Sequence, residues 1–489
     1  MNKMEYKKPE TMPEKLDTDV SGRTEGPLIG TRYGMPKMSN IMDEKRSQVI
    51  YMFEIEGTVP AVISNHYPDI VIPHSAEIIY RATNREYVNA HIDEILQDVT
   101  RREAIKHHRE DCIFDNIRET VGPEAASFVH LFLTSADSSE TAKYLMDRDG
   151  LEELIPNLEY LRDACLFYAK EWTKYITTQS THGADAVPEY FGRRLATEAR
   201  ALQLNINELY RDRKLHVVGK LSGATGNYHP MVSRGVDGKM IEKECCDIWE
   251  VIPAKASLQD PTREYLAYII SHLAISARTI ANITRWIKYN KNTARGELRE
   301  PRDEGMAGSS AMPHKDPNPY VEERVIGFAN MISKISSTIT DSADREDARN
   351  LEASALDRKL IPESFIIVDY GAALAVNVLE RLVPQPDKIR KSLHRVHDTT
   401  TSENIRYQLV GKGMPDREAR KLSGDLARQA VATNTPYRKV LEGDEKVREF
   451  LSEKEIGILA NPRNYTGDSK EIIEEAYEEL FGKTGPQED

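Results

Sequence analysis

Four long stretches without proline or glycine in the middle of the chain constrain its fold more than any other feature. They cover residues 157–182, 193–218, 262–295 and 328–361. Because proline and glycine punctuate helices, stretches of this length predict helices longer than most globular proteins contain. A helix of about 30 residues spans about 45 Å and needs packing partners along its whole length. We therefore expect a helix bundle that other subunits complete.

The segment 264–288 shows the helical period that such a bundle requires. The apolar residues on one side of this helix are Leu266, Ile270, Leu273, Ala277, Ile280, Ala281 and Ile287. Small residues such as Ala267 and Ser271 flank them and allow helices to approach closely. No run of alternating β-branched residues predicts a large sheet. The predicted fold class is all-α, with three helical domains and a central long-helix bundle completed by tetramerisation.

The spacing of proline and glycine also divides the chain. Residues 1–125 are predicted to form an N-terminal helical domain. Residues 126–370 carry the long helices and the loop discussed below, and they form the predicted central bundle. Beyond that point the helices become shorter and are interrupted more often. Residues 371–489 are therefore predicted to form a small C-terminal helical domain.

The overall charge and composition argue against several classes of partner. The 489 residues carry a formal net charge of −13, so no basic footprint indicates nucleic acid or an anionic membrane. The polar N-terminus lacks the apolar core of a secretory signal, and no apolar run approaches the roughly 18 residues of a membrane span. The four cysteines show no metal-ligand spacing. These features predict a cytoplasmic protein in which a small anionic substrate would need a local cluster of arginine and lysine.

The segment 305–319, GMAGSSAMPHKDPNP, is the most informative one for chemistry. One interpretation is an ordinary connection between two helices. The other is a binding loop, whose Gly-Ser-Ser turn presents backbone N–H groups and hydroxyls to an anion. Lys315 adds a positive charge and Asn318 adds amide donors. Together these groups would hold a carboxylate while negative charge develops on it.

This segment resembles the GSSxMPxKxNP motif of the fumarase/aspartase superfamily. Thr134–Asp137 is similar to the TSxD stretch of that family, and Thr181–Gly183 is similar to a further conserved stretch, in the family's order. The resemblance implies an all-helical homotetrameric lyase. The sequence shows no metal, flavin, nicotinamide or pyridoxal motif, so no cofactor is expected. The chain departs from the motif at one point, because one extra residue separates Lys315 from Asn318.

The resemblance also implies the roles of the catalytic residues. In an anti β-elimination, Ser309 removes a proton from a succinyl carbon and His182 protonates the leaving nitrogen. Lys315 and Asn318 hold the dianion that forms. Histidine exchanges protons near neutral pH, which suits this role, although without the resemblance His182 is better interpreted as a capped or core histidine. The other candidate histidines are His107, His108 and His130.

Within the superfamily, further stretches resemble those of the adenylosuccinate lyases. Gly219–Tyr228 is similar to their GKxxGAxGNY stretch, and Tyr407–Ala419 to their C-terminal LVxKGxxREEA stretch. The implied reaction releases fumarate from adenylosuccinate to give AMP, and from succinylaminoimidazole carboxamide ribotide, in purine nucleotide biosynthesis. The implied substrate contacts are Arg32, Tyr33, His108, Thr134, Ser135, Asn227, Asn318, Arg324, Arg349, Ser354 and Arg358.

Three of these residues, Arg349, Ser354 and Arg358, have two interpretations. Arginine pairs with phosphate through two hydrogen bonds, and Ser354 and Arg358 are four residues apart on one predicted helix face. A nucleotide phosphate would explain this cluster, whereas on composition alone it is a solvated charged face. The alternatives are another fumarate-releasing lyase, similar to argininosuccinate lyase, and a non-catalytic helical scaffold.

Overall fold

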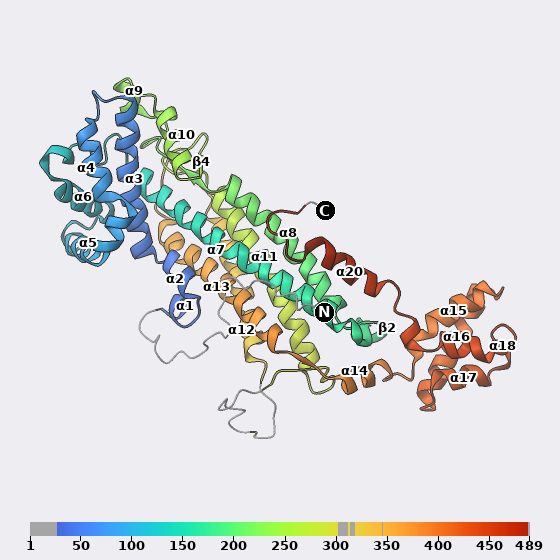
Figure 1. Cartoon of the computed structure of the whole chain (residues 1–489). Helices are drawn as coiled ribbons and strands as arrows, with labels where there is room; N and C mark the ends of the chain where they lie inside the picture. Colours follow the sequence, from blue (N-terminus) through green and yellow to red (C-terminus); the bar gives the residue numbers. More distant parts are fainter. Residues whose placement is uncertain (1–26, 302–311, 313–317, 345, 488–489) are drawn as a thin grey trace.

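The computed structural model describes residues 27–301, 312, 318–344 and 346–487. At the centre of this part of the chain lies a bundle of long helices (Figure 1). These helices are α7 (Ser135–Glu171), α8 (Arg193–Leu215), α11 (Glu264–Lys291), α12 (Tyr320–Asp341) and α13 (Ser354–Arg381). The all-α prediction is confirmed, because the chain is 70% helical and its strands are few and short.

Helix α7 contains 37 residues and therefore extends over roughly 55 Å. The sequence predicts a helix that begins after Pro156, but α7 passes through this proline. Pro156 lies at an exposed position, so the carbonyl that loses its hydrogen bond can be reached by water. A Cβ atom on Gly150 would lie 2.2 Å from Met42 Cε and 2.9 Å from Phe365 Cδ1. Glycine at this position lets both side chains pack against α7.

The stretch 157–182 is only partly helical. After α7 and a short 3-10 turn, η1 (Trp172–Lys174), the chain forms strand β1 (Ile176–Thr181), which pairs antiparallel with β2 (Ala184–Tyr190). Three threonines in β1 favour the extended backbone. The absence of proline and glycine therefore did not guarantee a helix, and the resulting β1–β2 hairpin carries His182.

The stretch 328–361 is also interrupted, between the end of α12 and the start of α13. Arg263 Nε donates a hydrogen bond to the carbonyl oxygen of Ser342 at 2.8 Å. This contact satisfies a carbonyl at the C-terminal end of α12. The structure thus places Arg349 in a loop rather than on the helix that carries Ser354 and Arg358.

The elements at the N-terminal end of α7 come from two parts of the sequence (Figure 1). The first part contains α3 (Glu44–His66), α4 (Pro73–Thr83), α5 (Arg85–Lys106) and α6 (Arg109–Ala126). The second contains α9 (His229–Ser233), α10 (Gly238–Ile248) and the parallel pair β3 (Val218–Gly219) and β4 (Ile252–Pro253). The two short helices before the first part, α1 (Leu28–Thr31) and α2 (Pro36–Ile41), lie instead beside α13 and the middle of α7, where Lys37 pairs with Glu153.

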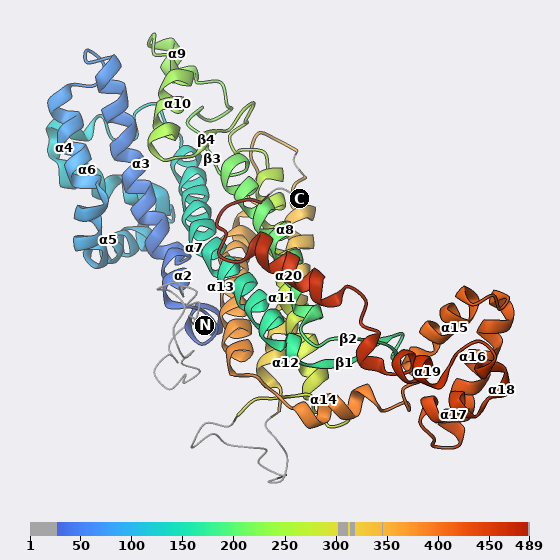
Figure 2. The same ribbon diagram turned by 45° about the vertical axis from the view of Figure 1, so that its right-hand side comes forward.

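At the opposite end of α7 lie the β1–β2 hairpin and the antiparallel pair β5 (Leu298–Arg299) and β6 (Val383–Pro384). Helix α14 (Pro386–Leu393) leads from there to a group of short helices with its own core (Figure 2). These are η2 (Thr399–Thr401), α15 (Ser402–Gly411), α16 (Asp416–Ala432), α17 (Tyr437–Gly443), α18 (Glu445–Arg448), α19 (Glu453–Leu459) and η3 (Pro462–Asn464).

The last helix, α20 (Ser469–Leu480), leaves these short helices and packs against α7 and α8. Its buried residues join the main core, which extends from Met35 to Ile389, whereas a second core lies between Ile405 and Ala460. The domain boundaries at 125 and 370 stay a prediction.

Helices α11 and α13 are long and apolar enough to cross a membrane by length and composition alone. Within their most apolar windows, 61% of α11 and 83% of α13 is buried inside the protein. Their apolar faces therefore serve the core of the bundle, and α11 leaves part of its apolar surface uncovered.

Candidate active site

The N-terminal turn of α7 is fixed by a buried ion pair. Asp137 Oδ1 accepts hydrogen bonds from Lys220 Nζ at 2.6 Å and from the backbone N–H of Gly223 at 3.1 Å, and both charged side chains are fully buried. The backbone N–H of Thr134 donates to Asp137 Oδ2 at 2.7 Å, as part of a capping box. Two stretches that the sequence singled out separately, Thr134–Asp137 and Gly219–Tyr228, are thus held together.

A cavity of about 560 Å³ opens beside this turn. It is lined by Lys106, His108, Asp111, Phe114, His130, Leu133, Thr134 and Ser135. His130 Nδ1 lies 2.9 Å from Glu56 Oε1, and its ring stacks on Phe114. Of the adjacent pair of histidines, His108 lines the cavity, whereas His107 caps the end of α5. Asn227 is exposed in the loop that follows β3.

Gln259 connects Thr134 to the loop that contains Arg349. Its side-chain Nε2 donates to Thr134 Oγ1 at 3.4 Å, and its backbone N–H donates to the carbonyl of Ala348 at 3.3 Å. Arg349 and Ser354, the first residue of α13, line one small recess there. The Arg349 guanidinium lies 3.7 Å from Asp260 and 3.9 Å from Glu140, too far for hydrogen bonds to either carboxylate.

Arg358 lies close in sequence to this recess but does not line it. Its guanidinium lies 3.1 Å from Glu110 and 3.7 Å from Glu44. The structure therefore brings Arg349 and Ser354 together and leaves Arg358 paired with acidic residues of α6 and α3.

Arg32, Tyr33 and Arg324 form a further group, beside α12 and α13. The Arg324 Cζ atom lies 5.1 Å from the centre of the Tyr33 ring, and Arg32 Cζ lies 5.7 Å from it. Arg324 Nη1 donates to Tyr370 Oη at 3.4 Å. Cation–π contacts of this kind hold the two arginines on one aromatic side chain.

His182 lies at the opposite end of α7, at the exposed tip of the β1–β2 hairpin (Figure 2). Thr181 pairs with Ala184, so His182 and Gly183 are the two central residues of the turn. Their φ angles are +52° and +79°, as a type I′ hairpin turn requires. Within one chain, the length of α7 separates His182 from Thr134.

Two of the predicted catalytic residues, Ser309 and Lys315, lie outside the described residues. Asn318 is exposed just before α12 and lines a cleft of about 1520 Å³. Lys288, Arg299 and Lys388 line the same cleft, so it has a cationic side. Among the residues that the structure describes, no three His, Cys, Asp or Glu side chains are grouped as metal ligands.

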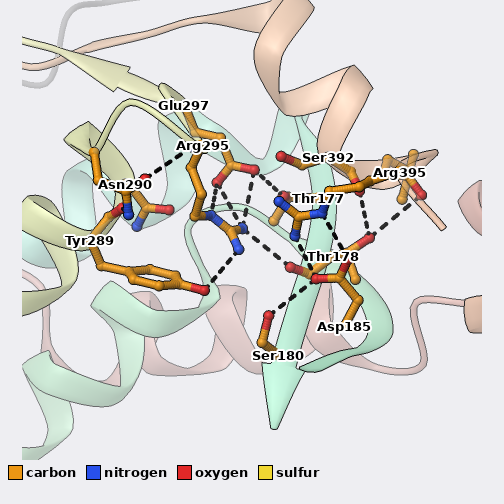
Figure 3. Close-up of polar contacts among 12 residues, drawn as sticks. Thr177, Thr178, Ser180, Asp185, Tyr289, Asn290, Arg295, Glu297, Ser392 and Arg395 are labelled. Carbon is orange, nitrogen blue, oxygen red and sulfur yellow. Dashed lines mark hydrogen bonds and ion pairs between the residues drawn. The ribbon is translucent and has the colours of Figure 1, made fainter. Parts of the chain in front are cut away.

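Several residues with a structural role near these positions were not found from the sequence. They are Gln259 and two ion pairs beside the hairpin, Arg295–Glu297 and Asp185–Arg395 (Figure 3). The Thr-x-x-Asp spacing of Thr134–Asp137 is a capping signal that sequence rules can recognise. Arg395, which contacts Asp185, and Thr134, which contacts Gln259, are each more than 100 residues away from their partner, and no local pattern indicates such contacts.

Comparison with known proteins defines the class. A family model described as "Lyase" matches residues 70–333, more than half of the chain, and a second, "Adenylosuccinate lyase C-terminus", matches residues 399–476. The chain therefore belongs to the lyase family. This confirms the resemblance to the fumarase/aspartase superfamily and, within it, to the adenylosuccinate lyases.

Two curated relatives are both named adenylosuccinate lyase. The one from Pyrococcus horikoshii is 29% identical over 453 residues, covering 92% of this chain and 97% of the relative. The one from Methanocaldococcus jannaschii is 25% identical over 456 residues, covering 93% and 96%. The enzyme class predicted from the sequence is confirmed.

Solved structures show the same fold at lower identity. The 3-carboxy-cis,cis-muconate lactonizing enzyme from Pseudomonas putida has a TM-score of 0.80 at 22% identity and covers 93% of this chain and 98% of its own. The fumarate lyase from Mesorhizobium sp. BNC1 has a TM-score of 0.78 at 20% identity and covers 94% and 100%.

Proposed function

We propose that this lyase releases fumarate from adenylosuccinate to give AMP, and also acts on succinylaminoimidazole carboxamide ribotide. The observation that carries the proposal is the recess of Arg349 and Ser354, which is joined through Gln259 to Thr134. A nucleotide lyase needs a phosphate site close to its succinyl site. The relatives named adenylosuccinate lyase, which cover more than nine-tenths of the chain, support the same substrate.

Two groups of the recess suit a phosphate, although the carboxylates of Glu140, Asp260, Asp347 and Asp357 also line it, beside Lys143 and Arg263. The guanidinium of Arg349 lies too far from Asp260 and Glu140 to form hydrogen bonds with them. Its N–H groups can therefore donate two hydrogen bonds to a phosphate. Ser354 is the first residue of the 28-residue helix α13, where backbone N–H groups and the helix dipole favour an anion. Arg358 would join this site only after leaving Glu110.

The proposed elimination breaks the bond between the purine amino nitrogen and the succinyl carbon. Ser309 takes the proton from the neighbouring succinyl carbon, the electron pair forms the double bond of fumarate, and His182 gives a proton to the leaving nitrogen. Lys315 and Asn318 stabilise the negative charge that develops on the succinyl carboxylate. Thr134, Ser135 and Asn227 are proposed to contact the succinyl group, with His108 beside them.

The backbone of His182 supports a functional role. A residue other than glycine in the left-handed region costs about 1 kcal/mol, and asparagine is the residue that type I′ turns prefer at this position. His182 keeps φ at +52° at an exposed tip, where no packing requires a histidine. Because His107, His130 and His397 also have positive φ, the support comes from the exposed position of His182 at the tip together with its φ.

The proposed site draws on several chains. The length of α7, roughly 55 Å, separates His182 from Thr134, so one chain cannot surround one small substrate with both residues. Tyr268 and Ile275 on α11 are 53% and 52% exposed, and they offer apolar surface to other copies. We propose a homotetramer located in the cytoplasm.

A substrate panel tests the proposal. The purified protein is expected to release fumarate from adenylosuccinate, followed by absorbance, and Ser309→Ala is expected to abolish turnover. Release of fumarate from argininosuccinate alone would identify a different lyase of the superfamily. No turnover with any succinyl substrate would favour the non-catalytic scaffold. An active monomer in sedimentation analysis would contradict the shared site.

A further inference from the structure

The tip of the β1–β2 hairpin receives little support from its own surroundings. Residues 181–184 are exposed, and a Cβ atom on Gly183 would meet no heavy atom within 4 Å. The position of His182 is therefore determined by how the strands below the tip are held. Two clusters of polar side chains hold them (Figure 3).

The first cluster holds the beginning of β1 and is buried. Glu297 Oε1 accepts a hydrogen bond from Thr177 Oγ1 at 3.0 Å, and Arg295 Nη2 donates to the carbonyl of Thr178 at 3.4 Å. Arg295 and Glu297 form an ion pair at 2.9 Å with side chains 6% and 0% exposed. Buried charges that are fully paired in this way resist displacement, because separating them would leave an uncompensated charge.

The register of the hairpin shifts between Gln179 and Ser180. A bulge of this kind bends the strand and changes its twist, so the first cluster does not by itself fix the strand ends that carry the tip. Beyond the bulge the strands depend on the second cluster.

The second cluster lies directly below the tip. Ser180 Oγ donates to Asp185 Oδ1 across the hairpin at 3.3 Å. Arg395 Nε donates to Asp185 Oδ2 at 2.9 Å, and its Nη2 donates to Oδ1 at 2.5 Å. Arg395 belongs to the segment between α14 and η2, so the carboxylate of the hairpin is fixed to a separate part of the protein at two points.

We propose that Arg395 is a positioning residue for His182: through its two-point contact with Asp185 it orients the hairpin tip so that the imidazole meets the substrate. The inference rests on the proposed function of His182. A planar guanidinium fixes a carboxylate in both distance and angle, which the single ammonium group of lysine cannot do.

Because the Asp185–Arg395 pair lies near the surface, its effect on the position of His182 can be distinguished from its effect on stability. The Arg395 side chain is 39% exposed and that of Asp185 is 9% exposed. Ion pairs near the surface contribute little to the stability of the fold. A misplacement of about 1 Å in a catalytic group can cost about 100-fold in rate. Loss of Arg395 should therefore reduce turnover far more than it reduces stability.

The kinetic test compares Arg395→Gln, Arg395→Lys and the control Arg390→Gln in the full-length protein. Arg390 lies on α14 and pairs within that helix with Asp387 in an exposed contact. Arg395→Gln is expected to lower kcat with adenylosuccinate by about 10-fold with KM within about 2-fold. Arg395→Lys should be intermediate, and Arg390→Gln should match the wild type. An unchanged kcat in Arg395→Gln overturns the proposal.

A second comparison tests whether the effect passes through His182. In a His182→Asn background, Arg395→Gln should cause no further loss of the residual kcat, because residues that act as a unit are not additive. An equal loss in both backgrounds would show a general structural effect and overturn the proposal.

Hydrogen exchange tests the inference without turnover. Backbone amides of residues 176–190 should exchange faster in Arg395→Gln than in Arg390→Gln, while the peptides of α11 stay unchanged. Equal exchange in the two variants overturns the proposal. If the wild type fails to act on adenylosuccinate, the proposed function fails, and the exchange measurement still decides whether Arg395 holds the hairpin.

Discussion

The two ends of helix α7 hold the candidate residues in contrasting ways. At the N-terminal end, Asp137 and Lys220 form a fully buried pair that fixes Thr134 and the loop after β3. At the C-terminal end, His182 occupies an exposed tip that is held only from below. The contrast fits the proposed roles, in which the rigid end contacts the substrate and the exposed His182 donates a proton. An assembly of several chains would bring unlike ends together.

The largest expected effect tests the role of His182 at the exposed hairpin tip. His182→Asn should lower kcat by about 100- to 10,000-fold, the usual contribution of a general acid. Stability should stay equal or rise, because asparagine accepts positive φ more easily than histidine. Steady-state turnover and thermal unfolding measure the two effects. The control is His397→Asn, at another histidine with positive φ, which should keep its activity. If the His182→Asn variant kept a turnover within about 3-fold of the wild type, His182 would not be the acid.

The second expected effect tests the rigidity of the buried end. Lys220→Met leaves Asp137 buried without its cation, so the free energy of unfolding should fall by about 3–5 kcal/mol. Denaturant unfolding measures this change. Lys243→Met is the matched control, because Lys243 and Asp247 form an exposed pair, and such pairs contribute little to stability. If the free energy of unfolding fell equally in the two variants, the buried pair at the N-terminal end of α7 would not be the rigid support described above.

The third expected effect concerns the recess of Arg349 and Ser354 at the same end, which is proposed to bind the phosphate. Arg349→Gln should raise KM for adenylosuccinate by about 10- to 100-fold with a smaller change in kcat, as expected for the loss of hydrogen bonds to a charged group. Arg358→Gln should raise KM less, since Glu110 and Glu44 already engage that side chain. A larger effect from Arg358 would show that the nucleotide draws it into the site.

The smallest expected effect is a pH dependence of stability at the C-terminal end of α8, which packs along α7. A hydrogen bond to Asp212, which lies 2.7 Å from His272 Nδ1, raises the pKa of His272 above 6.5. Its stabilising contribution is therefore complete below pH 6.5 and is lost as pH rises through the higher pKa of the folded state. The difference in unfolding temperature between wild type and His272→Gln should shrink from pH 6 to pH 9. A constant difference would show that protonation of His272 does not contribute.

Local patterns in the sequence predicted some elements well. The period of 264–288 closely matches α11, which ends at Lys291, because one apolar face of that helix packs into the core. The spacing of Thr134 and Asp137 is a capping signal at the real start of α7, whereas the stretch without proline and glycine predicted a helix only after Pro156. Both features depend on neighbours within a few residues, which is the range that sequence patterns report.

Contacts between distant segments could not be predicted in this way. The β1–β2 hairpin lies in a stretch without proline or glycine, and its pairing is decided by β-branched residues and by side chains such as Arg295 and Arg395. The spacing of Ser354 and Arg358 predicted one shared anion site, but Arg358 contacts Glu110, 248 residues away. Charge partners at such separations depend on the tertiary fold.

The return of α20 to the bundle gives the short C-terminal helices the topology of an insertion. Their polypeptide leaves the bundle after α14 and re-enters at α20. Beyond α20, the backbone N–H groups of Gly482 and Gly485 donate to Asp163 and Glu159 of α7. Because two segments of the chain connect the short C-terminal helices to the bundle, these helices cannot rotate about a hinge in one connection alone. Any displacement of these helices would therefore strain both connections at once: the segment after α14, where Arg395 lies, and the segment that leads back to α20.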